Sequence, residues 1–383
     1  MALHFEPLEY AERLERLTAA MKAEKLDALL LFAQESMYWL TGYDTFGYCF
    51  FQTLVVKADG SMTLLTRSAD LRQARHTSNI ENIQVWVDRV NADPTMDLKN
   101  LLSELDLLGM RIGIEYDTHG MTGRVARLLD RQLSTFGELI DASMVVSSLR
   151  LIKSPAELKY VEQAASLADD ALDAALPLIR PGGSEADILA AMQGAVFAGG
   201  GDYPANEFII GSGADALLCR YKAGRRTLDA NDQLTLEWAG ASAHYHAAMM
   251  RTIVIGEPTN RHRELYSACR EAIQGIEMVL RPGNTFGTVF DVHAKIMDER
   301  GLARHRLNAC GYSVGARFSP SWMEHQMFHL GNTQAIEPDM SLFVHMIIMD
   351  SESGTAMTLG QTYITTEGAP RALSRYGLDF IAI

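Results

Sequence analysis

The feature of this sequence that most restricts its fold is an internal repeat in the second half of the chain. Ile-Arg-Pro-Gly at residues 179–182 is matched, about 100 residues later, by Leu-Arg-Pro-Gly at residues 280–283. Each copy ends one helical pattern and precedes another, at residues 184–198 and 285–299. We then expect glycine-containing turns at residues 211–213 and 311–313, followed by strands ending in residues 234–238 and 342–348. Two halves with the same order of elements predict a pseudo-symmetric α+β domain with its site between the halves.

The preceding part of the chain predicts a smaller α/β domain. Apolar spacing favours helices at residues 10–24 and 121–133, and short apolar runs favour strands at residues 28–32 and 111–115. Residues 52–56 and 61–66 are predicted to form a hairpin that turns at Asp59-Gly60. Ser154, Pro155 and Glu157 then have the chemistry of a strong helix start. We therefore place the domains at residues 1–147 and 148–383.

Composition excludes several classes of function. The formal charge of the 383 residues is −14, without a run of basic residues, which argues against a nucleic-acid partner. The longest apolar stretches are too short to span a membrane, and the first six residues lack the features of a signal peptide. The cysteines are widely spaced, which favours reduced thiols and a cytoplasmic protein; they are Cys49, Cys219, Cys269 and Cys310.

Several segments of the chain resemble the family of creatinase, methionine aminopeptidase and Xaa-Pro dipeptidase. They are residues 149–154 (LRLIKS), 232–240 (DQLTLEWAG), 250–252 (MRT), 311–315 (GYSVG), 336–340 (IEPDM) and 365–368 (TTEG). The resemblance implies an α/β creatinase-like N-terminal domain followed by a pita-bread catalytic domain. Metallopeptidases of this fold hold two divalent ions with two Asp, one His and two Glu, and the ions generate a hydroxide nucleophile.

At the metal-ligand positions implied by this resemblance, the sequence keeps one carboxylate. The five positions fall on Glu237, Ala248, Tyr312, His345 and Gly360, or on Gln361 for the last if the alignment shifts by one. A histidine that contacts substrate in the peptidases is replaced by Arg220. Because a lone Glu cannot supply the anionic oxygens that two divalent ions need, we expect no metal and no other cofactor.

Metal-free members of the family provide a nearer resemblance. Creatinase cleaves a C–N bond without a metal. Ectoine hydrolases share a Leu-Glu-x-Ala-Gly strand, a Tyr-His pair and a Gly-Tyr-Ser-x-Gly…Pro-x-Trp-x-Glu-His-x-Met block, which match residues 236–240, 245–246 and 311–327 here, and residues 39–44 match as well. The chain departs from them at residues 45–52 and around His345, so the substrate is not predicted. The resemblance implies attack by Glu237 on an amidine carbon and a covalent intermediate that water resolves.

Glu237 is the first candidate for catalysis. Its apolar neighbours Leu236 and Trp238 predict a desolvated carboxylate whose pKa is raised, as suits a nucleophile or a general base. The alternative is a structural Glu that pairs with Arg251 or Arg220.

Two histidines follow at a spacing of two, which places them on one face if both lie on a strand. His246 is a candidate acid/base and His244 a candidate substrate contact. Both are alternatively core or rim histidines held by hydrogen bonds.

The remaining candidates are spread along the chain. Glu324 and His325 offer a second acid/base pair, with the alternative that only one of these adjacent residues faces the site. His345 is a candidate proton shuttle, with a buried structural histidine as the alternative. Candidate substrate contacts are Arg220, which suits a carboxylate, together with Tyr312, Trp322 and Tyr48. The alternative for Arg220 is pairing with Glu237 or Glu207. We expect a homodimer. The resemblance to creatinase-like dimers implies that Trp39, Phe46 and Tyr48 cover the partner's pocket, and core packing is the alternative for each of them.

Three functions remain open from the sequence. The first is a metal-independent hydrolase that cleaves a C–N bond in a small amidine or amide. The second is a metal-dependent Xaa-Pro dipeptidase, aminopeptidase or lyase on the same scaffold. The third is a catalytically silent paralogue that binds a ligand or regulates a partner.

Overall fold

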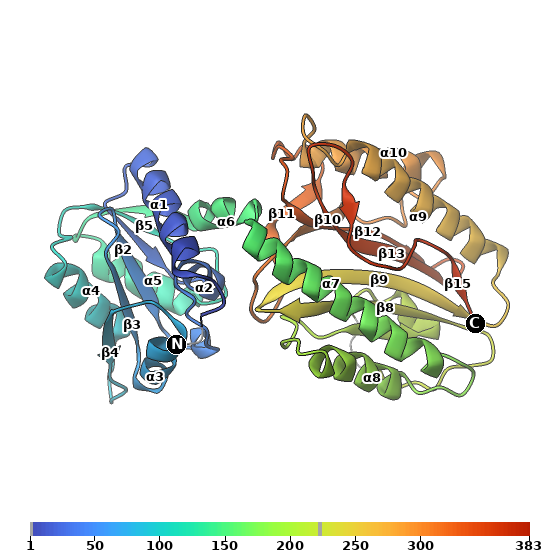
Figure 1. The fold of residues 1–383 in the computed structure, drawn as a ribbon, viewed down its shortest axis with the longest axis horizontal. Coiled ribbons are helices and arrows are strands. Elements are labelled where there is room, and N and C mark those ends of the chain that lie inside the picture. Colours follow the sequence, from blue (N-terminus) through green and yellow to red (C-terminus); the bar gives the residue numbers. More distant parts are fainter. Residues whose placement is uncertain (1–2, 221–223) are drawn as a thin grey trace. The chain divides into compact units, whose positions relative to one another are not determined.

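The structure is a computed structural model that describes residues 3–220 and 224–383. The chain forms two compact units, Met1–Arg150 and Leu151–Ile383. The first unit contains α1 (Pro7–Ala23), β1 (Ala28–Leu31), α2 (Gln34–Thr41), η1 (Gly47–Cys49), β2 (Thr53–Lys57), β3 (Met62–Arg67), α3 (Ser68–Thr77), β4 (Asn82–Trp86), α4 (Pro94–Glu104), β5 (Arg111–Ile114), α5 (Gly123–Leu133), β6 (Glu138–Asp141) and the start of α6 (Ser143–Leu151) (Figure 1).

The first unit is the predicted α/β domain. Its sheet has the order β4-β3-β2-β1-β5-β6 in the described residues, with β1, β5 and β6 parallel. β2 and β3 form the predicted hairpin, antiparallel and joined through a turn in which Gly60 has a φ of 85°. The expected strands and helices of this unit are confirmed to within a few residues.

The second unit contains two helix pairs and a large mixed sheet. Its elements are α7 (Pro155–Ala175), η2 (Leu176–Leu178), α8 (Glu185–Ala198), β7 (Ile209–Ser212), η3 (Gly213–Leu217), β8 (Asp232–Ser242), β9 (Tyr245–Ile255), α9 (Asn260–Val279), α10 (Phe286–Glu299), β10 (Ala309–Val314), β11 (Met323–His329), β12 (Ser341–Asp350), β13 (Thr355–Ile364), β14 (Arg371–Ala372) and β15 (Ile381–Ala382). Ser154 and Glu157 form the predicted capping box at the start of α7.

The order of strands in this sheet reproduces the repeat seen in the sequence. The order is β11-β10-β12-β13-β9-β8-β7, so that the hairpins β8–β9 and β12–β13 meet at the centre. α7 packs on β8 and β9, and α9 packs on β12 and β13 (Figure 1). Gly182 and Gly283 have φ values of 80° and 92°, which explains the recurring Pro-Gly after each helix. This is the pseudo-symmetric pita-bread architecture that the sequence predicts.

Two parts of the sequence interpretation are wrong. Residues 211–212 end β7 and residues 311–313 lie inside β10, so these glycines do not form the predicted turns. Gly311 is needed because a Cβ there would lie 2.3 Å from the carbonyl oxygen of Phe343 on the neighbouring strand. His244 is not on a strand with His246, since Ala243 and His244 form the two-residue turn between β8 and β9, with φ values of 48° and 63°.

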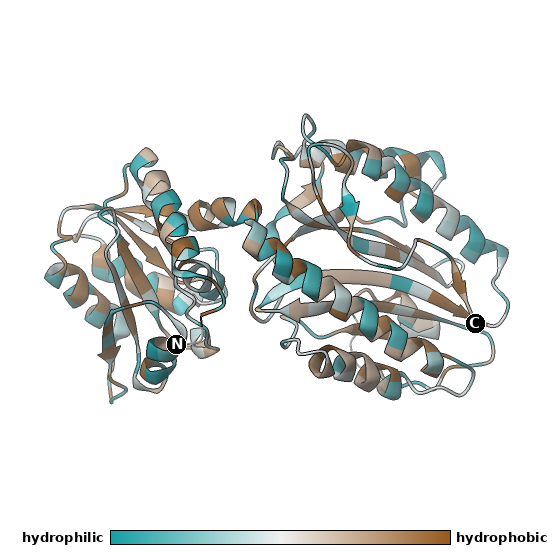
Figure 2. Cartoon of the chain, viewed as in Figure 1, coloured by the Kyte–Doolittle hydropathy of each residue, from teal (hydrophilic) through white to brown (hydrophobic). Residues whose placement is uncertain are grey.

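The hydrophobic cores lie between these helices and strands. One cluster joins α7 and α8 to Leu234, Leu236 and Trp238 of β8, and another joins α9 and α10 to Leu342 and Val344 of β12. Figure 2 shows apolar colour along the strands and polar colour on the outer faces of α7 and α9. Within the described residues, no helix has the length and apolarity needed to cross a membrane.

Candidate active site

One face of the large sheet brings the predicted site positions together. Glu237 on β8 pairs with Met250 on β9, Met250 with Gly360 on β13, and Gly360 with His345 on β12. Directly paired residues in antiparallel strands share a face. Ala248 lies two residues from Met250, and Tyr312 on β10 pairs with Phe343, two residues from His345. All five positions implied by the family resemblance therefore lie on the face that points away from the helices.

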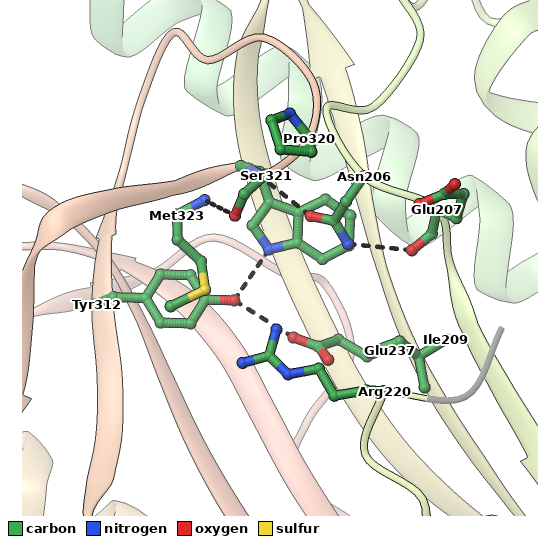
Figure 3. A pocket seen from close by; sticks show the side chains of 10 residues that line it. Asn206, Glu207, Ile209, Arg220, Glu237, Tyr312, Pro320, Ser321 and Met323 are labelled. Carbon is green, nitrogen blue, oxygen red and sulfur yellow. Dashed lines mark hydrogen bonds between the residues drawn. The ribbon is translucent and has the colours of Figure 1, made fainter. Parts of the chain in front are cut away.

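A cavity of about 220 Å³ opens at one end of this face (Figure 3). Its lining combines one end of the sheet with residues of three irregular segments, which precede β7, β8 and β11. The lining residues are Asn206, Glu207, Ile209, Arg220, Glu237, Tyr312, Pro320, Ser321, Trp322 and Met323. The cavity therefore contains four of the residues predicted from the sequence.

Glu237 is the buried carboxylate of this cavity. Leu236 and Trp238 pack toward α7, so Glu237 points to the opposite face and is 8% exposed. Burial raises the pKa of Glu237 to about 7, although the charge of Arg220 and a hydrogen bond from Tyr312 act in the opposite direction. The predicted desolvation of this carboxyl group is confirmed, and the group changes charge near neutral pH.

The aromatic residues of the cavity form a hydrogen-bonded chain that ends at Glu237. The indole Nε1–H of Trp322 donates to the hydroxyl oxygen of Tyr312 at 2.9 Å, and this hydroxyl donates to Oε1 of Glu237 at 3.3 Å. Burial raises the pKa of Tyr312 well above its ordinary value, so the phenol stays protonated. The sequence placed Tyr312 and Trp322 near substrate but did not reveal this chain.

Arginine supplies the positive charge of the cavity. Arg220 lies at its lining, directly before residues 221–223, and its charge acts on Glu237 (Figure 3). Arg251 does not pair with Glu237, because its guanidinium donates to the carbonyl oxygens of Met250, Gly360 and Gly377. Of the two arginines named as alternatives for pairing, Arg220 is therefore the one that faces the carboxylate.

Hydrogen bonds and a ring contact involve the two neighbouring histidines, whose predicted roles as acid/base and substrate contact stay predictions. His246 is fully buried; Nε2 accepts from the backbone N–H of Ala205 at 2.9 Å, and Nδ1 contacts the carbonyl oxygen of Gly315 at 3.2 Å. Burial lowers the pKa of His246 to about 3, so its ring is neutral. The ring of His244 stacks on Phe318 with 4.2 Å between centroids. Neither histidine is among the described residues that line the cavity.

His345 lies next to the cavity without lining it. Its ring is 5.6 Å from that of Tyr312 between centroids, and burial lowers its pKa to about 3. Among the described residues, its Nδ1 has no hydrogen-bond partner. The imidazole of His345 is therefore neutral and lies beside the ring of Tyr312. The predicted role of His345 as a proton shuttle stays a prediction.

Glu324 and His325 point to opposite faces of β11. The carboxylate of Glu324 is buried with Lys153, which it contacts at 2.9 Å, and it also accepts a hydrogen bond from Ser313. His325 is exposed. Because Met323 is the residue of β11 that lines the cavity, this geometry does not support the predicted acid/base pair. Tyr48 lies in η1 of the first unit, half-buried, and its predicted role across a dimer stays a prediction.

Comparison with known proteins identifies the family. Residues 159–367 match Metallopeptidase family M24, and residues 13–152 match the Creatinase/Prolidase N-terminal domain. The chain belongs to metallopeptidase family M24.

Relatives of this chain include an ectoine hydrolase and Xaa-Pro dipeptidases. Ectoine hydrolase from Halomonas elongata is 27% identical over 360 residues, which are 89% of each chain. Xaa-Pro dipeptidase from Pyrococcus furiosus is 24% identical over 304 residues, 79% of this chain and 82% of that protein. The solved prolidase from Thermococcus sibiricus has a TM-score of 0.87 at 18% identity and covers 98% of this chain and 99% of that chain. This last likeness shows the fold.

The donor set of this M24 member does not fit a pair of divalent ions. Glu237 contributes a carboxylate and His345 a neutral imidazole nitrogen, but Ala248 and Gly360 have no side-chain donor, and Tyr312 is a protonated phenol. The cation of Arg220 also faces Glu237. Hard divalent ions need several anionic oxygens. The residues at these positions therefore do not support a reaction step on a pair of bound divalent ions.

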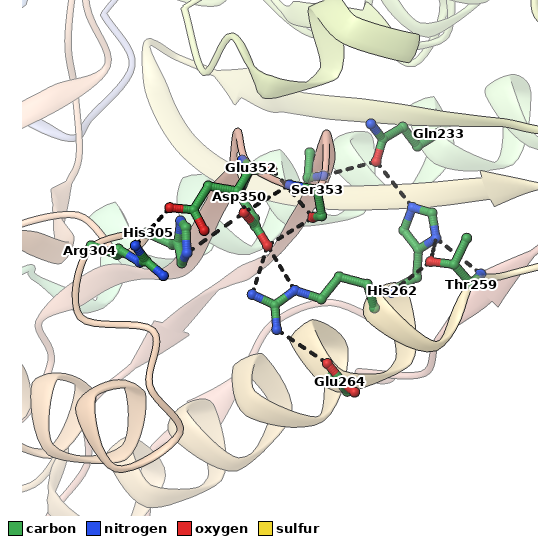
Figure 4. Close-up of polar contacts among 11 residues, drawn as sticks. Gln233, Thr259, His262, Glu264, Arg304, His305, Asp350, Glu352 and Ser353 are labelled. Carbon is green, nitrogen blue, oxygen red and sulfur yellow. Dashed lines mark hydrogen bonds and ion pairs between the residues drawn. The ribbon is translucent and has the colours of Figure 1, made fainter.

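A second group of potential ligands lies elsewhere in the second unit (Figure 4). Single atoms of His305, Asp350 and Glu352 lie within 4.8 Å of one another. Arg261 contacts Asp350 at 2.7 Å, and Arg304 contacts Glu352 at 2.7 Å. Because both carboxylates already face a guanidinium, this cluster is an ion-pair network that ties the β12–β13 turn to α9.

Sequence reasoning missed six residues of the cavity, and the available signal differed among them. The block that resembles ectoine hydrolases, residues 311–327, includes Pro320, Ser321 and Met323. The resemblance therefore pointed to this segment, although these three residues were not predicted as site residues. Asn206 accepts a hydrogen bond from the backbone of Trp322, and it lies beside Glu207 in an irregular segment. That segment, together with Ile209, has no periodicity or motif that would have indicated a site.

Proposed function

We propose that this protein is a metal-independent hydrolase that cleaves a C–N bond in a small nitrogen compound, such as a cyclic amidine or an amide. The observation that carries the proposal is a buried Glu237, with a pKa raised by burial to about 7, facing Arg220 in a small cavity. The sequence similarity to an ectoine hydrolase supports the same class of substrate. A cavity of about 220 Å³ suits a small molecule better than a peptide chain.

Glu237 has two chemically consistent roles in this reaction. As a nucleophile, its carboxylate adds to the electrophilic carbon, and water later hydrolyses the covalent intermediate. As a general base, it takes a proton from a water molecule that attacks the same carbon. Both roles need the ionised form. Arg220 is placed to bind a carboxylate of the substrate or to stabilise negative charge that develops during the attack.

The proposal is tested by screening cyclic amidines, creatine and guanidino acids with the wild-type protein and with Glu237→Gln. We expect turnover of at least one compound, and a loss of roughly 10²–10⁴-fold or more in the variant. The variant must retain its circular dichroism spectrum, and Glu352→Gln, which alters an exposed carboxylate outside the cavity, provides a matched control. A Glu237→Gln protein that keeps more than about a tenth of the rate would sink the assignment.

The second candidate is an Xaa-Pro dipeptidase that uses a metal, because relatives with this name cover most of the chain. Elemental analysis of the purified protein separates the two. We expect no stoichiometric divalent ion and no loss of turnover on incubation with a chelator. Roughly two bound ions per chain, together with chelator-sensitive hydrolysis of Xaa-Pro dipeptides, would favour the metallopeptidase instead.

A further inference from the structure

The hydrogen-bonded chain in the cavity has a fixed direction. An indole N–H donates and cannot accept, whereas a phenol oxygen accepts and its hydrogen donates. Because Trp322 occupies the oxygen of Tyr312 as a donor, the phenol hydrogen is left for Glu237. Figure 3 shows the hydroxyl of Tyr312 directed toward the carboxylate of Glu237.

All three members of the chain are buried. Trp322 is 1% exposed, Tyr312 is 3% exposed and Glu237 is 8% exposed. They come from β8, β10 and the segment before β11, so the contact does not follow from sequence proximity. A hydrogen bond to a charged acceptor is stronger in such surroundings than in water.

We infer that Trp322 and Tyr312 are positioning residues that hold Oε1 of Glu237, favour its ionised form and leave Oε2 to face the reacting carbon or the attacking water. This inference rests on the proposed function, since it assigns both residues to the service of Glu237. A carboxylate with one oxygen held has fewer orientations, which helps an attack that needs a defined geometry.

Other charged or titratable groups lie near the Trp322–Tyr312–Glu237 chain. The ring of His246 on β9 is 6.4 Å from that of Trp322 between centroids, and burial lowers the pKa of His246 to about 3. Arg220 and Glu207 lie at the cavity lining, and His345 stands beside Tyr312, with His293 of α10 acting on it. Burial lowers the pKa of His345 to about 3 and that of His293 to about 4, so both are neutral at the pH where Glu237 titrates. Within the hydrogen-bonded chain of Trp322, Tyr312 and Glu237, it is therefore Glu237 that changes charge near neutral pH.

The inference is tested by measuring the protonation of Glu237 directly. Infrared difference spectra across a pH series, compared with Glu237→Gln, identify the carboxyl band of this residue. In Tyr312→Phe we expect its midpoint to rise by about one pH unit, because the ionised form loses a hydrogen bond. The 3.3 Å length of that bond argues against a larger shift. In Trp322→Phe we expect a smaller rise.

A matched control is provided by Tyr363, a second buried phenol in the same sheet. Its hydroxyl accepts from Gln361 at 2.8 Å and donates to Glu277 at 2.7 Å, which repeats the donor–phenol–carboxylate order on the helix side. Tyr363→Phe is expected to leave the midpoint of Glu237 unchanged. A fluorinated tyrosine at position 312 preserves the fold and is a stronger donor, so the midpoint should fall.

Unchanged midpoints in both Tyr312→Phe and the fluorinated protein would overturn the inference. The inference would also be overturned if Tyr363→Phe shifted the midpoint of Glu237 as much as Tyr312→Phe does. The effect would then not be specific to the hydrogen bond between Tyr312 and Glu237. The infrared readout needs no turnover. If the midpoints move as expected while no compound is hydrolysed, the proposed function fails, and only the hydrogen-bonded control of the Glu237 carboxylate by Tyr312 and Trp322 stands.

Discussion

At the scale of single residues, the buried carboxyl group of Glu237 makes the stability of the protein depend on pH. The pKa of a Glu side chain rises from 4.5 to about 7 at this position, because burial disfavours its charge. Folding therefore favours the protonated form. The contribution of Glu237 to the stability of the folded state is fully present below the unfolded pKa and is lost as the pH rises through about 7.

Glu237→Gln should consequently stabilise the protein at alkaline pH, because the amide cannot acquire the charge. We expect a gain on the order of 2–3 kcal/mol near pH 9 and little difference near pH 4. Urea unfolding at a series of pH values measures it. A difference between the two proteins that does not depend on pH would contradict this account of Glu237.

The sequence predicts the burial of Glu237 because that burial depends on its immediate neighbours. It could not predict the environment of His246, whose Nε2 is held by the backbone of Ala205, a residue 41 positions away. Nor could it predict that Trp322 reaches the hydroxyl of Tyr312. Such contacts depend on how irregular segments pack on the sheet, and local patterns carry no information about that.

At the scale of elements, a buried ion pair joins the start of α7 to β11. Lys153 and Glu324 have side chains that are 1% and 3% exposed and lie 2.9 Å apart. Lys153 also donates to Ser313 of β10 at 3.3 Å. A buried pair is weak evidence of net stabilisation, but the removal of one partner leaves the other charge in surroundings that solvate it poorly.

Lys153→Met should therefore destabilise the protein by about 3–5 kcal/mol. Chemical denaturation measures this change, and Lys159→Met, on the exposed side of α7, is the matched control with an expected change near zero. If the double variant Lys153→Met, Glu324→Gln were no more stable than Lys153→Met, the loss would have to come from packing and not from the unpaired charge.

Periodicity predicts most of these elements, whereas glycine misled the interpretation. Glycine at positions 211 and 311 suggested turns, but both residues lie in strands. At Gly311 the reason is the close approach of Phe328 and Phe343, which leaves no room for a side chain. Conversely, the β8–β9 turn consists of Ala243 and His244, neither of which is a usual residue for left-handed φ values. Without a typical turn residue at these positions, the sequence interpretation placed His244 and His246 together on one strand.

At the scale of the whole molecule, the repeat predicts the architecture because each half must bury its helices against its own hairpin. The same repeat does not predict whether two copies of the protein associate or through which surface. The first unit exposes Phe46 by 76% and Phe50 by 48%, within the aromatic segment that the sequence suggests for an interface. Exposed aromatic side chains that lie close together are typical of protein–protein contacts.

We expect the protein to be a homodimer that depends on this aromatic segment. Light scattering at micromolar concentration should give twice the mass of one chain, and Phe46→Ser should shift the equilibrium toward monomer. Val90→Ser, which alters an apolar residue outside the segment that is even more exposed than Phe46, serves as the control. A fully active monomeric wild-type protein would contradict the idea that a partner's Tyr48 completes the site.

The close packing of α7 on β8 also bears on how new specificities can arise in this scaffold. A Cβ at Gly240 would lie 2.0 Å from the carbonyl oxygen of Ala164, so the strand that carries Glu237 cannot accept a side chain at this position where α7 packs on it. Most other cavity residues come from irregular segments, including Asn206 and Ser321. Laboratory evolution toward a different substrate should therefore accumulate its changes at residues 201–208 and 316–322, and leave the sheet untouched.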